Sequence, residues 1–175
     1  MKKYIFVFIT IASVYSCCPK DKQKEISPDL IEAWIPYQEG DKIFYHNENN
    51  ELDSTEVVLI EKAFSASGHW CGMTSETVSM NINGNSFTTL GVRLKRHSIS
   101  FRLTKDSITK NIYDYDFNDK KSHVFDTPDF FTDIVIGNTN YKNVFGLLMD
   151  SVMIYYGENN GIIGYKEGEQ TFIKN

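Results

Sequence analysis

The chain has 175 residues, with 18 basic and 23 acidic side chains and a net charge of −5 at neutral pH. This length suits one domain with a substantial core and is short for two domains of ordinary size. Because the chain is net acidic and shows no basic cluster, we expect it to bind neither nucleic acid nor anionic lipid headgroups.

The N-terminus has the order of an export signal. Lysines at positions 2 and 3 precede the apolar residues 4–15, and the small residue Ser16 stands directly before Cys17. Since about 20 helical residues are needed to span a bilayer core, the apolar block is too short to predict a transmembrane helix. An ordinary secretory signal cut nearby would have the same order.

Val14-Tyr15-Ser16-Cys17 resembles the lipobox of bacterial lipoproteins. In that family an aliphatic residue lies three places before the cysteine and a small residue directly before it. The resemblance implies a signal peptide over residues 1–16, cleavage between Ser16 and Cys17, and a diacylglycerol and an acyl chain such as palmitate on Cys17. We therefore expect a lipoprotein of the bacterial cell envelope, held by its lipid chains at the outer membrane on the periplasmic or surface side.

Residues 17–28 predict a flexible tether, since they are polar, carry charges of both signs and contain prolines near each end. Once Cys17 is acylated, only Cys18 and Cys71 are left in the chain. A disulfide between them would pull the domain onto the bilayer, so we expect both to be free thiols.

Residues 29–175 predict a single, mainly β domain. Ser27 as N-cap and Pro28 in the first turn favour a short helix that Pro36 would end. From Asp41 onward, apolar and polar positions alternate between turns that recur about every 8 to 12 residues. The connections are too short for parallel crossovers, so we expect one antiparallel meander, curved into a half-barrel or a sandwich-like shape, with little helix.

The alternation also indicates which side chains face the core. The expected core positions are Val78, Met80, Ile82, Leu90, Val92, Leu94, Ile99, Phe101 and Leu103. Residues 127–134 predict either a second short helix or a cover in which Phe130, Phe131 and Ile134 close an open end of the sheet. The aromatic content of 14% is enough for Phe and Tyr to fill a concave face, which would otherwise need a ligand.

Two stretches resemble small, uncharacterised lipoproteins of Bacteroidetes-type bacteria. The matching residues are Pro36, Tyr37, Gly40 and Asp41 before the first expected strand, and Tyr155, Tyr156, Gly161, Ile162, Ile163, Gly164 and Tyr165 near the end. The resemblance implies an exported β domain and no activity. The closing hairpin is also similar to that of periplasmic half-barrel lipoproteins that handle acyl chains, which is a likeness of fold and not of function.

Two clusters suggest chemistry and also have simpler interpretations. His69 and Cys71 would share a face of a strand, where an imidazole can activate a thiol, but no orienting third group is evident and a buried free cysteine usually only packs. Asp114, Asp116, Asn118 and Asp119 have a spacing similar to a calcium loop but lack its glycine and its final glutamate. A strand with Tyr113, Tyr115 and Phe117 facing the core explains the same residues.

Other motifs of enzymes are missing from the sequence. His46, His69, His97 and His123 have no metalloprotease spacing, and there is no phosphate-binding glycine loop or dinucleotide fingerprint. Three Asp-Ser pairs, at positions 53, 106 and 150, resemble an O-glycosylation acceptor of Bacteroidetes exported proteins. We take Ser54, expected in the first polar turn, as the candidate acceptor.

The sequence therefore favours a non-catalytic binding or structural module, without cofactor or metal, that contacts another envelope component. The first alternative is a carrier of an apolar or acyl-chain ligand in a half-barrel. The second is a thiol enzyme that uses Cys71 and His69. A large apolar cavity would support the carrier, whereas a core filled by Phe and Tyr would oppose it.

Overall fold

The computed structural model describes residues 25–66, 74–119, 121–122 and 129–175. In this part of the chain, 12 strands form one antiparallel sheet with the order β7-β6-β5-β4-β3-β2-β1-β12-β11-β10-β9-β8. The strands are β1 Lys42–His46, β2 Leu52–Ala66, β3 Thr74–Gly84, β4 Thr89–Lys95, β5 Ser98–Lys105, β6 Ile108–Asp116, β7 Lys121–Ser122, β8 Asp129–Ile136, β9 Thr139–Met149, β10 Val152–Gly157, β11 Gly161–Glu167 and β12 Gln170–Lys174. The predicted meander is confirmed, and the pairing of β1 with β12 joins its two halves.

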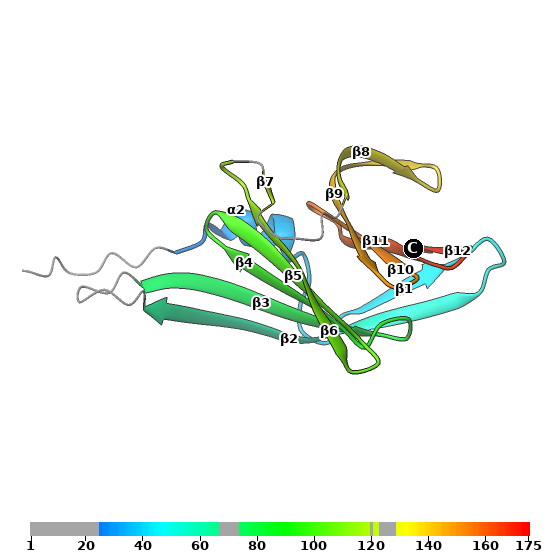
Figure 1. Cartoon of the computed structure of the whole chain (residues 1–175), viewed down its shortest axis with the longest axis horizontal. Coiled ribbons are helices and arrows are strands. Elements are labelled where there is room, and N and C mark those ends of the chain that lie inside the picture. The colour runs from blue at the N-terminus through cyan, green and yellow to red at the C-terminus, as the bar shows by residue number, and fades with distance from the viewer. Residues whose placement is uncertain (1–24, 67–73, 120, 123–128) are drawn as a thin grey trace, which may run out of the picture.

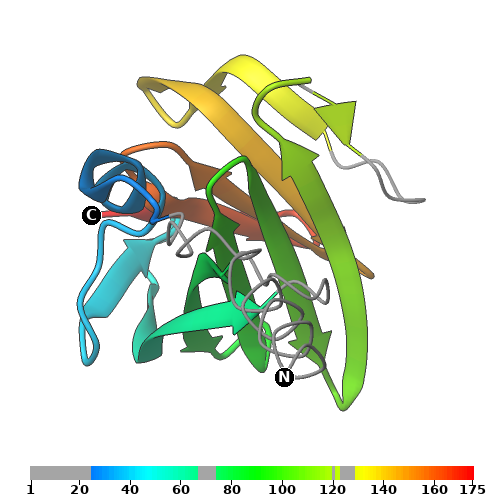
Figure 2. The same ribbon diagram turned by 90° about the vertical axis from the view of Figure 1, so that its left-hand side faces the viewer.

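The sheet is curled into a half-barrel, with the short helix α2 (Pro28–Trp34) at one end (Figures 1 and 2). Throughout, the inner face is the concave face of the sheet and the outer face is the opposite one. The described part of the chain contains no helix that is long and apolar enough to cross a membrane.

The inner face is packed with apolar side chains, as the alternation predicts. Every core position expected in β3, β4 and β5 is buried. Aromatic rings fill the centre: Phe101 lies 5.1 Å from Phe145 and 5.2 Å from Tyr156 between ring centroids, and Tyr115 lies 5.2 Å from Phe145. The concave face is therefore occupied by the protein's own side chains.

Helix α2 closes one end of this core. Ser27 is its N-cap and Pro28 is in its first turn, as predicted, and the helix stops at Trp34 before Pro36. The Trp34 ring packs against Phe117 and Phe145 at centroid distances of 5.6 and 5.5 Å. Trp34 thus joins the helix to the turn after β6 and to strand β9, one from each half of the sheet.

The folded unit also takes in part of the expected tether. Ile26 is 3% exposed and belongs to the inner core. Its backbone N–H donates to the buried carboxylate of Glu76 at 2.7 Å, and Lys62 lies 3.8 Å from the same carboxylate. This contact fixes the start of the domain against the β2–β3 hairpin.

A second, smaller apolar cluster lies on the outer face of the C-terminal half. Its buried members are Ile136, Val144 and Ile163, and Phe131 and Ile134 pack against it. Val144 and Ile163 neighbour the inward-facing Phe145 and Ile162 in sequence and so point to the opposite face. The alternative of a helix at residues 127–134 is wrong for its described part, since Asp129–Ile136 is strand β8.

The two stretches that carry the resemblance to lipoproteins lie against each other. The Tyr37 hydroxyl donates to the carbonyl of Asn160 at 3.0 Å and accepts from the N–H of Ile162 at 2.9 Å. Between them, Gly161 has φ +65°, and an added Cβ would lie 2.2 Å from the Tyr37 ring. Glycine is therefore required there by both conformation and packing.

Candidate binding site on the outer face

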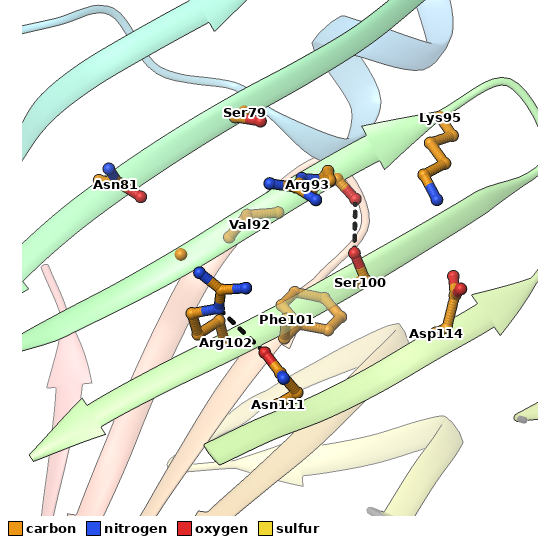
Figure 3. Close-up of a pocket in the computed structure, with 11 residues that line it drawn as sticks. Ser79, Asn81, Val92, Arg93, Lys95, Ser100, Phe101, Arg102, Asn111 and Asp114 are labelled. Carbon is orange, nitrogen blue, oxygen red and sulfur yellow. Dashed lines mark hydrogen bonds between the residues drawn. The ribbon is translucent and has the colours of Figure 1, made fainter. Parts of the chain in front are cut away.

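The outer face of β3–β6 carries a polar hollow of about 330 Å³. Its lining residues are Ser79, Asn81, Gly91, Val92, Arg93, Lys95, Ser100, Phe101, Arg102, Asn111 and Asp114. Figure 3 shows the polar side chains around a common space, with the guanidinium groups of Arg93 and Arg102 on one side and Lys95 and Asp114 on the other.

The register of the strands explains why these side chains meet. Asn81, Gly91, Arg102 and Asn111 are successive cross-strand partners from β3 to β6 and make one row across the sheet. Ser79, Arg93, Ser100 and Asp114 make the next row on the same face. Directly opposed side chains have Cβ atoms about 5 Å apart, and diagonal neighbours are within reach of long side chains.

A β-bulge brings β6 into this arrangement. Arg102 pairs with Asn111 and the preceding Phe101 pairs with Tyr113, so β6 has one extra residue between them. Asn111 and Asp114 are three apart and would face opposite sides of a regular strand, but the extra residue places both on the outer face.

The hollow is rich in unpaired positive charge. Arg93, Lys95 and Arg102 line it with Asp114 as the single acid. Among the residues that the structure describes, none of these cations forms an ion pair, and the Arg102 Nε donates to the amide oxygen of Asn111 at 2.9 Å. That bond fixes the guanidinium and leaves its terminal N–H groups toward solvent.

Asp114 supplies an acceptor to the same hollow. Its Oδ1 is shielded from solvent and makes no hydrogen bond within the described chain. The rest of the carboxylate lines the hollow, where it can accept hydrogen bonds from a ligand.

Gly91 forms the floor of the hollow. Because it has no side chain, the space between Asn81 and Arg102 stays open: an added Cβ would lie 3.3 Å from Asn81 Oδ1 and 3.6 Å from Arg102 Cβ. Its φ lies outside the left-handed region, so the position is open to other residues on conformational grounds. The small side chains of Ser79 and Ser100 widen the space to either side.

The arrangement can bind an anion together with hydrogen-bond donors. Guanidinium groups hold carboxylates and phosphates by two parallel hydrogen bonds, and Asp114 accepts from hydroxyl or amino groups. The lining contains no Cys or His side chain.

A second hollow of about 560 Å³ lies between α2 and the β2–β3 hairpin. Ile26, Ile31 and Ile35 line it on one side, and Lys62 and Glu76 line it on the other. It is more apolar in character than the hollow on the outer face, and it adjoins the start of the domain.

Several predicted site residues lie outside the described residues. These are the lipidation and cleavage residues Ser16 and Cys17, the free thiol Cys18, and the pair His69 and Cys71. The expectations attached to them stay predictions.

The remaining predicted positions are described. Asp116 Oδ1 accepts the N–H groups of Asn118 and Asp119 and so caps a turn after β6, while Asp114 lines the outer hollow. Tyr115 and Phe117 pack in the inner core as predicted. In the described ranges, no three His, Cys, Asp or Glu side chains are placed to hold a metal ion.

The glycosylation candidate Ser54 is not in a turn as expected. It lies in β2, which is paired on both sides, opposite Phe44 of β1. The polar turn ends earlier, because Asn47 accepts the N–H groups of Asn49 and Glu51 and closes it. Ser107 and Ser151, from the other two Asp-Ser pairs, are exposed between strands.

The sequence did not predict the basic hollow, because no run of basic residues stands out along the chain. A signal was present: the three arginines of the chain, Arg93, Arg96 and Arg102, fall within ten residues. Alternation puts Arg93 and Lys95 on one face of β4, but only the register of β4 with β5 shows that Arg102 joins them.

The chain matches no family model, and neither a curated protein nor a solved structure shows significant similarity to it.

Proposed function

We propose that this chain is a lipid-anchored, non-catalytic binding module of a bacterial cell envelope, which contacts an anionic partner through the outer face of β3–β6. The observation that carries the proposal is the hollow in which Arg93, Lys95 and Arg102 are unpaired by any carboxylate among the described residues. A net acidic chain that places two of its three arginines on one face favours a negatively charged partner at that face.

The filled inner face also supports a binding role for the outside of the sheet. A carrier that holds its ligand inside a half-barrel needs open volume there, whereas Phe101, Phe145 and Tyr156 are 0–2% exposed and pack on one another. Burial raises the pKa of Tyr156 well above its usual value, as expected for a phenol in a closed core.

The test is affinity capture with a charge-matched control. The full-length lipoprotein would be extracted in detergent as wild type, as Arg93→Ser/Arg102→Ser, and as Lys42→Ser/Lys166→Ser, which loses the same charge elsewhere. Lys42 and Lys166 are exposed and do not line the hollow. We expect an envelope component to be retained by the wild type and the control and lost by the arginine variant. Equal retention by all three proteins would contradict the proposal.

The lipid anchor is tested separately. We expect Cys17→Ala to abolish lipid attachment and to leave the signal peptide uncleaved, so that the protein keeps its unprocessed size. A variant that stays in the membrane with its processed size unchanged would refute anchoring through Cys17.

A carrier function is the second candidate, and the hollow beside α2 favours it. Ile31 lines that hollow and is only partly buried, so a charge at this position would oppose an acyl chain. If the protein carries lipid there, mass spectrometry of the purified wild type should find a lipid that is missing from Ile31→Glu. The same lipid content in both proteins would count against a carrier.

A further inference from the structure

We infer that the hollow on the outer face binds a carboxylated sugar unit of an acidic saccharide, with the carboxylate at Arg93 and Arg102 and sugar hydroxyl groups at Asp114. This inference rests on the proposed function, since it names the ligand class of the same face.

The two arginines are placed to hold one carboxylate. Arg93 is paired with Ser100, and Arg102 is paired with Gly91, so the two arginines are diagonal neighbours on adjacent strands. Long side chains reach one another across a diagonal of about 7–8 Å. Figure 3 shows both guanidinium groups on the same side of the hollow, where Arg102 is held by Asn111. A carboxylate between them would accept charge-assisted hydrogen bonds from both.

Asp114 selects against a simple anion. A phosphate or sulfate group offers chiefly acceptor oxygens, and these would be repelled by the Asp114 carboxylate that lines the hollow. A sugar carries several hydroxyl groups, each of which can donate to a carboxylate. Lys95 and Asn111 line the same space and can supply further donors, whereas the Ser100 hydroxyl donates to the carbonyl of Arg93 and can accept from a ligand.

The site fits a saccharide better than a peptide. β3, β4 and β5 are each paired on both sides, so their backbone groups are unavailable for the addition of a peptide strand. Peptide interfaces also depend on apolar anchors in pockets, whereas the floor here is Gly91 and most of the lining side chains are polar. A volume of about 330 Å³ is at the lower end of the range for small-molecule sites, about 300–1,000 Å³, and suits one sugar unit.

The experiment is a set of binding titrations on the detergent-solubilised full chain. The probes are an oligogalacturonate, a neutral oligosaccharide of equal length, inorganic phosphate and an acidic peptide. Hydrogen bonds to charged groups are the strong ones, so we expect the oligogalacturonate to bind at least about tenfold more tightly than each of the other probes.

Two variants give the inference its sharpest test. Asp114→Asn keeps the shape and an acceptor, but it removes the negative charge, so we expect about tenfold weaker binding of oligogalacturonate and tighter binding of phosphate. Gly91→Val fills the floor without changing charge and should abolish binding of the saccharide. Lys42→Ser/Lys166→Ser should bind like the wild type. Thermal unfolding of each variant checks that it is folded, and Asp114→Asn carries the test alone if Gly91→Val does not fold.

Other outcomes would overturn the inference. Phosphate binding as tight as oligogalacturonate binding, or an Asp114→Asn variant that binds both more tightly, would identify a simple anion site. Preference for the acidic peptide would identify a protein partner, and no binding of any probe would exclude the saccharide. In each case the capture experiment with Arg93→Ser/Arg102→Ser decides independently whether the outer face binds a partner at all.

Discussion

The two halves of the sheet use their outer faces differently. In the C-terminal half, Val144 and Ile163 are buried on the outer face beneath residues of β8 and β9. In the N-terminal half, the outer face of β3–β6 carries Arg93, Lys95 and Arg102 around an open hollow. The inner face is common to both halves. The inner face therefore holds the fold together. The outer face is part of the core in the C-terminal half and is available for binding in the N-terminal half.

Alkaline pH should unfold both halves of the sheet together, because they share the inner core, and this is the largest effect that we expect. Burial raises the pKa of Tyr45, Tyr156 and Tyr165 above the usual value of about 10. Below that pH these tyrosines are neutral in both states. Above it they ionise only in the unfolded chain, and each then costs about 1.4 kcal/mol of stability per pH unit. Since total stability is typically about 5–15 kcal/mol, unfolding should follow within a few pH units.

The measurement is circular dichroism and tyrosinate absorbance against pH. We expect the part of the absorbance change that Tyr156→Phe removes to coincide with the change in circular dichroism, and we expect this variant to lose stability less steeply with pH. If that part of the absorbance changed before unfolding, Tyr156 would ionise in the folded protein, and the inner face would be less closed than proposed.

Phe145→Ala should destabilise both halves by about 3–5 kcal/mol, the usual cost of removing a buried phenylalanine. The ring contacts Trp34 of α2, Phe101 of β5 and Tyr115 of β6, so it links the C-terminal half to the rest. Leu148→Ala is the control on the same strand, because Leu148 is 53% exposed. Chemical denaturation would measure both variants, and similar midpoints for the two would contradict this account of the core.

Ile163→Ala tests the outer cluster of the C-terminal half. Ile163 is 1% exposed, and its loss should cost about 2–4 kcal/mol, less than Phe145→Ala, because the outer cluster is smaller. Val135→Ala provides the control, since Val135 is 67% exposed on β8. If Ile163→Ala proved as mild as Val135→Ala, the outer faces of the two halves would not differ in the way described.

The fold was predictable because its signals are local. Alternation in β3, β4 and β5 fixed which residues face the core, and Ser27, Pro28 and Pro36 marked the limits of α2. These signals depend on the period of a strand and on the chemistry of helix ends, which any short window of sequence contains.

The candidate site was not predictable, because it depends on register. Gly91 faces Arg102 only when β4 and β5 pair as they do, and Asn111 joins Asp114 only through the bulge in β6. The outer cluster could not be predicted for a similar reason. Ile162 faces the inner core and the next residue, Ile163, faces outward. The two adjacent isoleucines do not indicate by themselves that other side chains bury Ile163.

The hollow itself should be the part of the sheet that tolerates change best. Arg93 and Arg102 are exposed and pair with no carboxylate among the described residues, so Arg93→Ser/Arg102→Ser should change the free energy of unfolding by no more than about 0.5 kcal/mol per site. Denaturation would measure this change on the same proteins that are used for capture. A much larger loss of stability would mean that the arginines hold the sheet together, as Ile163 does in the other half. If the arginine variant kept its stability but no longer retained a partner, the two arginines would serve binding and not folding. Side chains that serve only the fold cannot be removed without lowering the free energy of unfolding.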